Sequence, residues 1–152
     1  MAGLPGPHLD SSTLDLIGRF GINNFIYFRR NVENPEQLKK LSGDLRNACA
    51  AKGLQPPLIG IDQEGGTVAR LGPPFTQFPD ARVLAESPEP EQALRDYARV
   101  CSLELQSIGV NYNLAPVLDV SPAGKNLFME KRSLGGDPET VARLGNLVIR
   151  QL

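Results

Sequence analysis

Residues 58–71 read LIGIDQEGGTVARL, a short apolar run that ends in a carboxylate, a second acid and two glycines. A buried parallel strand has this pattern where it delivers polar side chains to a ligand at its carboxyl end. A second step of the same kind follows at Val117-Leu118-Asp119. The stretch therefore predicts an α/β fold with a parallel sheet, and it indicates a site at the carboxyl edge of that sheet.

The composition is typical of a soluble domain. The chain has 152 residues, 41% of them hydrophobic, and a net charge of −1 from 16 basic and 17 acidic residues. This length suits one domain, residues 1–152, with a substantial core. No apolar run could span a membrane, and the dispersed charges predict no nucleic-acid partner. Since the N-terminus lacks the features of a signal peptide, we expect a cytoplasmic protein. Cys49 and Cys101 are expected to be buried thiols on helices.

Strands and helices alternate along the chain. Strands are predicted at residues 1–4, 25–28, 58–61 and 110–120, the last of them interrupted by Pro116. A helix follows each strand, and the N-caps are expected at Ser11-Ser12-Thr13, Asn34 and Asp137. The proline-rich residues 72–90 predict a long loop. Four such units indicate a parallel sheet with right-handed crossovers, either a doubly wound open sheet or part of a (βα)8 barrel.

Four polar side chains fall after the predicted strands. Asp62 and Asp119 follow strands directly, and Arg70 and Arg132 lie in the loops that come next. A carboxylate accepts hydrogen bonds from vicinal hydroxyls and a guanidinium donates a fixed fork, so this set suits a polyhydroxylated ligand. Each residue also has a structural alternative, as a turn acid or as an exposed or salt-bridged arginine. Glu64 is expected to brace its neighbours rather than to contact a ligand.

Metal and cofactor signatures are absent from the sequence. The single histidine, His8, lies in an N-terminal turn and is expected at the surface. No HExxH, paired CxxC or Walker A pattern is present, and the glycines near the N-terminus do not fit GxGxxG. We therefore expect no metal and no cofactor.

Five motifs in order make the chain resemble glycoside hydrolase family 3 over essentially its whole length. The first is Asp62-Gln63-Glu64-Gly65-Gly66 with Val68 and Arg70-Leu71. The others are Phe28-Arg29-Arg30-Asn31 with Asn34-Pro35-Glu36-Gln37-Leu38, Phe75-Thr76 with Phe78-Pro79, Asn113-Leu114-Ala115-Pro116-Val117-Leu118-Asp119-Val120, and Arg132-Ser133-Leu134-Gly135 with Asp137-Pro138. The similarity is greatest to the β-N-acetylglucosaminidase branch, the NagZ-like enzymes of peptidoglycan recycling.

The resemblance implies a TIM-type (βα)8 barrel, of which this chain would supply about four βα units. It also implies retaining hydrolysis of terminal β-linked N-acetylglucosamine through a glycosyl-enzyme intermediate, with an aspartate nucleophile and a histidine that handles the proton. Positions matching Asp62, Arg70 and Arg132 hold the non-reducing sugar in the family, so these are the expected substrate-binding residues. Asp119 matches a family position without an assigned contact.

Two positions depart from the family pattern beside these residues. Thr67 stands where the family commonly has arginine, and Lys131 stands where it commonly has an acid before Arg-Ser. Both changes are expected to tune substrate preference without removing the arginines.

The catalytic residues are expected beyond Leu152, because the family's Lys-His-Phe-Pro-Gly-His segment and its later nucleophile do not occur in the chain. A complete barrel needs about 250 residues, so the chain resembles an N-terminal half that is inactive alone. Exposed strand edges predict self-association or instability. Two alternatives stay open: a family 3 β-glucosidase or β-xylosidase, and a non-catalytic α/β ligand-binding module, which a chain of this length would suit.

Overall fold

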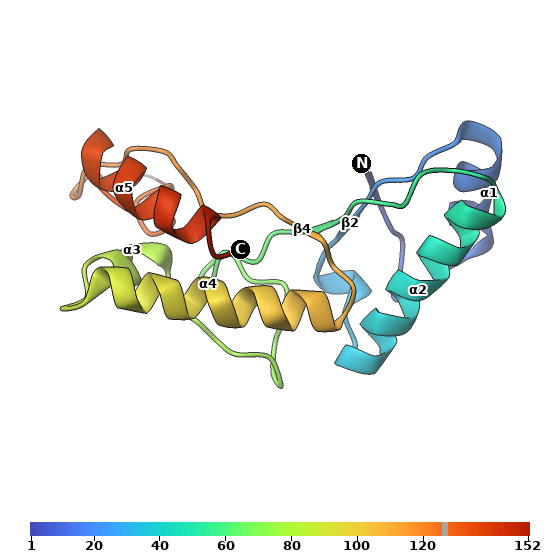
Figure 1. The fold of residues 1–152 in the computed structure, drawn as a ribbon, viewed down its shortest axis with the longest axis horizontal. Helices are drawn as coiled ribbons and strands as arrows, with labels where there is room; N and C mark the ends of the chain where they lie inside the picture. Colours follow the sequence, from blue (N-terminus) through green and yellow to red (C-terminus); the bar gives the residue numbers. More distant parts are fainter. Residues whose placement is uncertain (126–127) are drawn as a thin grey trace. The chain divides into compact units, whose positions relative to one another are not determined.

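The computed structural model describes residues 1–125 and 128–152 (Figure 1). They form two compact units, residues 1–62 with 104–113 and residues 63–103 with 114–152, and each is described by itself. The elements in chain order are β1 (Ala2–Gly3), α1 (Ser11–Phe20), β2 (Phe25–Tyr27), the 3₁₀ turn η1 (Arg29–Asn31), α2 (Pro35–Ala51), β3 (Ile59–Ile61), α3 (Ala81–Ala85), α4 (Pro90–Ser107), β4 (Tyr112–Asn113) and α5 (Pro138–Ile149).

The four strands that the structure describes make one parallel sheet in the first unit, in the order β1-β2-β3-β4. β2 pairs with β3 from Phe25 opposite Ile59 to Tyr27 opposite Ile61, and β1 and β4 extend the sheet on its two sides. A doubly wound sheet reverses its strand order at a switch point. The described strands instead follow chain order without a reversal, as strands of a (βα)8 barrel do. The predicted α/β fold with a parallel sheet is confirmed, and the strand order favours the partial barrel.

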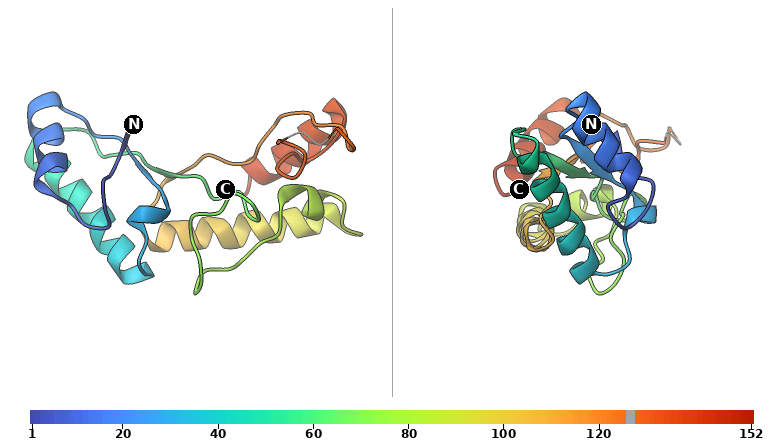
Figure 2. Two further views of the ribbon diagram at one scale, coloured as in Figure 1. Left: turned by 180° about the vertical axis from the view of Figure 1, so that it is seen from behind. Right: turned by 90° about the vertical axis from the view of Figure 1, so that its right-hand side faces the viewer.

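The centre of this sheet is fully buried. Phe25 and Tyr27 on β2 and Ile59 and Ile61 on β3 each have 0% exposed surface. Burial of a side chain of this size stabilises the fold by about 1.5–3 kcal/mol. α1 lies beside α2 in Figure 2, and the predicted apolar stripe of α2 is buried at Leu38, Leu41, Leu45 and Cys49.

A hydrogen bond between two side chains joins β2 to α2 within this core. The Tyr27 hydroxyl shares a hydrogen bond of 2.9 Å with the Ser42 hydroxyl on α2. Burial raises the pKa of Tyr27 to about 12, although the Ser42 hydrogen bond opposes the shift. Burial likewise raises the pKa of the Cys49 thiol. Cys49 and Cys101 are both buried thiols outside any disulfide, as predicted.

Polar caps start three of the helices. Asn34 Oδ1 accepts from the Gln37 N–H at 2.8 Å, and Asp137 Oδ1 accepts from the Thr140 N–H at 2.9 Å, as predicted. The cap of α1 is Asp10, not the expected Ser11-Ser12-Thr13, because its Oδ1 accepts from the Thr13 N–H at 2.9 Å. Hydrogen bonds from the Thr13 and Ser12 side chains, and then from the Thr13 N–H, stabilise the ionised form of Asp10 and lower its pKa. The Thr140 N–H and then the Thr140 side chain lower the pKa of Asp137 in the same way.

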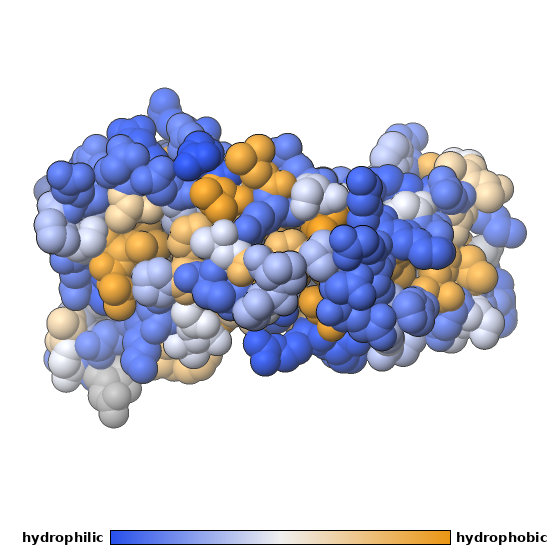
Figure 3. Space-filling view, turned by 90° about the horizontal axis from the view of Figure 1, so that it is seen from below, coloured by the Kyte–Doolittle hydropathy of each residue, from blue (hydrophilic) through white to orange (hydrophobic). Residues whose placement is uncertain are grey.

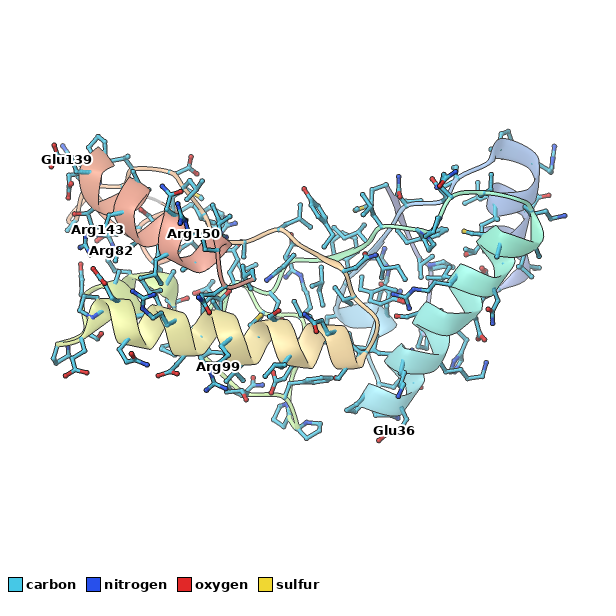
Figure 4. The ribbon with its side chains drawn as sticks, in the orientation of Figure 1. Glu36, Arg82, Arg99, Glu139, Arg143 and Arg150 are labelled. Atoms are coloured by element: carbon cyan, nitrogen blue, oxygen red, sulfur yellow. The ribbon has the colours of Figure 1, made fainter. Side chains whose placement is uncertain are left out.

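Residues 90–103 of α4 lie beside α5 in the second unit. Arg143 on α5, which Figure 4 labels, pairs with Glu91 near the start of α4 at 2.6 Å. The Tyr97 ring on α4 makes an edge-to-face contact with Phe78, with ring centroids 5.1 Å apart. The buried apolar residues of the two helices include Leu94, Tyr97, Ala98, Cys101, Val141, Leu144 and Val148.

The prediction of a fourth strand over residues 110–120 is wrong for most of its length. β4 spans only Tyr112–Asn113, so Asp119 does not follow a strand directly. Pro116 has no N–H to donate to a ladder, and β3 is the only described strand that pairs with β4. Hydrogen bonds to a later loop hold the segment instead. Ser133 Oγ donates to the Asp119 carbonyl at 2.6 Å, and the Ser121 N–H donates to the Gly135 carbonyl at 3.0 Å.

The long proline-rich loop contains a helix that the sequence analysis did not predict. α3 occupies Ala81–Ala85, a stretch between Pro79 and Pro88 that has neither proline nor glycine. Five residues give too few turns for a recognisable apolar period. None of the described helices is long and apolar enough to cross a membrane. On the face drawn in Figure 3, hydrophilic residues surround separate apolar patches.

Candidate sugar-binding site

The stretch after β3 turns back on itself immediately. The N–H groups of Glu64 and Gly65 both donate to the Val68 carbonyl, at 2.9 and 3.2 Å, and the Val68 N–H donates to the Gly65 carbonyl at 3.1 Å. Gly65 and Gly66 have φ values of 100° and 50°. Side-chain-bearing residues rarely adopt such angles, so the two glycines are what allows the chain to close this turn.

The turn packs closely against residues 78–80. The Gly66 N–H donates to the Phe78 carbonyl at 2.8 Å, and the Thr67 N–H donates to Asp80 Oδ1 at 2.6 Å. A Cβ atom on Gly65 would lie 2.7 Å from the Pro79 carbonyl oxygen, which is closer than real Cβ contacts. The glycines therefore serve both the turn and the close approach of the proline-rich segment.

Gln63 connects the turn to the backbone that carries Arg70. Its Oε1 accepts from the N–H groups of Arg70 and Leu71, at 2.8 and 3.1 Å. Its carbonyl accepts from the Tyr97 hydroxyl at 2.8 Å, and the side chain is buried. Gln63 thus fixes the backbone at Arg70 from within the core. The sequence analysis did not assign it this role, because a glutamine between two acids gives no sign of which way it points.

Arg132 is bound to the acid of the same turn. Its Nε donates to Glu64 Oε2 at 2.8 Å and its Nη2 donates to Glu64 Oε1 at 2.6 Å, which makes a bidentate ion pair. The side chains are 19% and 6% exposed. Arg132 also lies over the Phe128 ring at 5.0 Å and donates from Nη1 to Met129 Sδ at 3.3 Å. The structural alternative of a salt-bridged arginine is therefore observed, and the side chain that Glu64 braces is Arg132, far from it in the sequence.

The loop that carries Arg132 is held from α3. Arg82 donates from Nε to the Glu130 carbonyl at 3.1 Å and from Nη2 to the Ser121 carbonyl at 2.5 Å. Its backbone N–H donates to the Lys131 carbonyl at 3.1 Å. The sequence analysis missed Arg82, because its partners are backbone carbonyls about 40 or more positions away, and no residue pattern marks such contacts.

The predicted binding residues fall in different units. Asp62 is the first residue after β3, half-buried, in the first unit. Arg70 and Arg132 belong to the second, where Gln63 and Glu64 connect them to one turn. Asp119 is exposed, and its carbonyl rather than its carboxylate makes the contact with Ser133 described above.

Other candidate groups do not gather into a site. His8 is at the surface as predicted, with a side chain 71% exposed and 3.8 Å from Glu33. The described residues contain no group of three or more potential metal ligands. A cavity beside Glu64 and Arg132, lined mainly by apolar residues such as Leu94 and Val117, has a volume of about 10 Å³. It holds about one water molecule at most and is too small for a sugar.

The chain belongs to glycoside hydrolase family 3. The family model described as the glycosyl hydrolase family 3 N terminal domain matches residues 8–152. A β-hexosaminidase of Pseudomonas aeruginosa PAO1 is 31% identical over 152 residues, covering 99% of this chain and 43% of the relative.

Solved structures of family 3 enzymes are also similar to this chain. A family 3 β-N-acetylglucosaminidase from Paenibacillus sp. FPU-7 has a TM-score of 0.90 and 37% identity, covering 99% of this chain and 28% of that one. NagZ from Neisseria gonorrhoeae, in complex with N-trifluoroacetyl-D-glucosamine, has a TM-score of 0.87 and 30% identity, covering 100% of this chain and 45% of that one. The chain thus spans less than half the length of these relatives, and the predicted family resemblance is confirmed.

Proposed function

We propose that this chain is the amino-terminal part of the barrel domain of a retaining exo-β-N-acetylglucosaminidase, which removes terminal β-linked N-acetylglucosamine. The family membership and the names of the relatives support this proposal. A β-hexosaminidase and a β-N-acetylglucosaminidase each align with 99% of the chain at above 30% identity. The complex of gonococcal NagZ with an N-acylated glucosamine supports a small carbohydrate as the ligand.

Within this proposal, Asp62, Arg70 and Arg132 bind the non-reducing sugar. Asp62 offers a carboxylate directly after a strand, where it can accept hydrogen bonds from two adjacent hydroxyls. The observation that carries the assignment is that both arginines are joined to one turn: Glu64 holds Arg132 by the bidentate pair, and Gln63 Oε1 accepts from the Arg70 backbone N–H. The Arg132 guanidinium, held by Glu64, and the guanidinium of Arg70, whose backbone N–H is held by Gln63, can both donate to hydroxyl and amide oxygens of a sugar.

The test compares turnover of 4-nitrophenyl N-acetyl-β-glucosaminide and 4-nitrophenyl β-glucoside by the protein expressed from its complete gene. The product of the complete gene is needed because the family resemblance implies catalytic groups outside residues 1–152. We expect the N-acetylglucosaminide to be preferred. Replacing a charged hydrogen-bonding partner, as in Asp62→Asn, should lower kcat/KM by about 10- to 100-fold. Preference for the glucoside would instead support a β-glucosidase, and binding without turnover would support a ligand-binding module.

We also propose a cytoplasmic role in peptidoglycan recycling, which the NagZ-like pattern supports. Assay of cell fractions checks the location, and a periplasmic or secreted activity would contradict it. In addition, residues 1–152 alone should self-associate, because β1 and β4 each pair with one described strand and leave a sheet edge. Sedimentation of that chain tests this expectation, and a stable monomer would overturn it.

A further inference from the structure

The ion pair between Glu64 and Arg132 differs from the surface pairs of the chain. Its side chains are 6% and 19% exposed, whereas Arg143 and Glu91, also 2.6 Å apart, are 54% and 50% exposed. Exposed pairs contribute little, because water screens them. The Glu64 carboxylate is buried and the Arg132 guanidinium is largely shielded from water, so removing either one leaves a charge without its partner.

The geometry fixes the guanidinium in more than one direction. Two parallel N–H···O bonds set the plane of the Arg132 head relative to the Glu64 carboxylate. The Phe128 ring lies 5.0 Å from the guanidinium carbon, and Met129 Sδ accepts from Nη1. Glu64 itself is fixed by the turn, since its N–H donates to the Val68 carbonyl at 2.9 Å. The Glu64 carboxylate thus fixes the position of the Arg132 guanidinium relative to the turn.

The pairing also changes what Arg132 can attract. An arginine without a carboxylate is a strong receptor for anions such as carboxylate or phosphate. The Glu64–Arg132 pair has no net charge. The guanidinium carries five N–H donors in a fixed fork, and the bonds to Glu64 and Met129 use one each at Nε, Nη2 and Nη1. A head of this kind is suited to donate to neutral oxygens and gives no net attraction to an anion.

We propose that Glu64 is a positioning residue that holds Arg132 and cancels its charge, so that the subsite takes a neutral sugar in preference to an acidic or phosphorylated one. This inference rests on the proposed function of Arg132 as a sugar-binding residue. Glu64 makes no contact with the sugar and acts through the guanidinium.

The experiment uses the protein expressed from its complete gene and two probes, N-acetylglucosamine and glucuronic acid, with affinities measured by calorimetry. Glu64→Gln keeps the shape of the side chain and removes its charge. Glu91→Gln is the matched control, because it breaks a pair of the same length at the surface of the same unit. Both proteins are also compared by NMR at the Arg132 Nε–H, which should exchange slowly with water in the wild type.

We expect Glu64→Gln to weaken N-acetylglucosamine binding by about 10-fold, the loss typical of a charged hydrogen bond. Glucuronic acid should bind more tightly to it than to the wild type, and the Nε–H should exchange faster. Glu91→Gln should change none of these. If the role of Glu64 were purely structural, Glu64→Gln would weaken the binding of both sugars alike, and that result would overturn the proposal. Unchanged selectivity between the two sugars together with faster Nε–H exchange would overturn it as well.

A second variant covers the case in which Glu64→Gln does not fold. Glu64→Asp keeps the charge and withdraws the carboxylate by one methylene. The Arg132 Nε–H should then exchange faster with water, while glucuronic acid should bind as weakly as it does to the wild type. Tighter glucuronic acid binding by Glu64→Asp would refute charge cancellation. If the wild type binds no N-acetylglucosamine, the proposed function fails and the sugar role of Glu64 fails with it, whereas slow Nε–H exchange would still confirm the pair.

Discussion

Replacing Gly66 by alanine should destabilise the turn that holds both arginines of the site. Gly66 has a φ of 50°, a conformation that costs an alanine about 1–2 kcal/mol. An added Cβ would contact Asp80 Oδ1 and lie 2.5 Å from the backbone nitrogen of Asp80. Because that nitrogen belongs to the backbone, it cannot rotate away, and overpacking of this kind costs about 1–3 kcal/mol more.

The sum is a loss of about 2–5 kcal/mol in the free energy of unfolding. For a chain of this length it lowers Tm by about 4–20 °C. Urea unfolding and thermal melting followed by circular dichroism measure both quantities. Gly72→Ala is the matched control, since a Cβ there meets nothing within 4 Å and the residue lies in the same unit. A Gly66→Ala protein within about 0.5 kcal/mol of the wild type would refute the argument, because surface changes without a structural role fall in that range.

Three further changes test the description of the core and the caps. Asn34→Ala removes the cap bond to Gln37 and should cost about 1 kcal/mol in urea unfolding; an unchanged midpoint would contradict the cap. Because the folded pKa of Tyr27 is about 12 against an ordinary 10.0, stability should fall as pH rises from 10.0 towards 12, and Tyr27→Phe should abolish this part of the slope. Because the folded pKa of Asp10 lies below 3.8, its stabilisation should be present above pH 3.8 and lost as pH falls through the folded value; in acid melts, Asp10→Asn should flatten that loss.

Much of the fold could be predicted because its determinants are local. The strand at residues 58–61, the stripe on α2 and the caps at Asn34 and Asp137 depend on residues within a few positions of one another. Periodicity and capping chemistry are visible at that range. The length of the fourth strand was overestimated. A strand ends where its hydrogen bonds to the neighbouring strand end, and the sequence does not show which backbone groups will pair.

The candidate site was predicted in part. Its residue types and their place after a strand could be recognised, as could the family, because five motifs occur in order. The roles of Gln63 and Arg82 could not, since both act on backbone groups that are brought near only by folding. The departures at Thr67 and Lys131 are exposed positions whose effect on substrate preference stays a prediction.

The sequence by itself determined the α/β class, the parallel sheet, the helix starts at α2 and α5 and the family. These follow from contacts between near neighbours and from the order of motifs. Only the tertiary structure decided that Glu64 holds Arg132, 68 positions away, and that Gly65 and Gly66 lie against residues 78–80. Charge and hydrogen-bond donors are properties of single residues, but which donor meets which acceptor depends on the path of the chain, and that path is set by burial of the core.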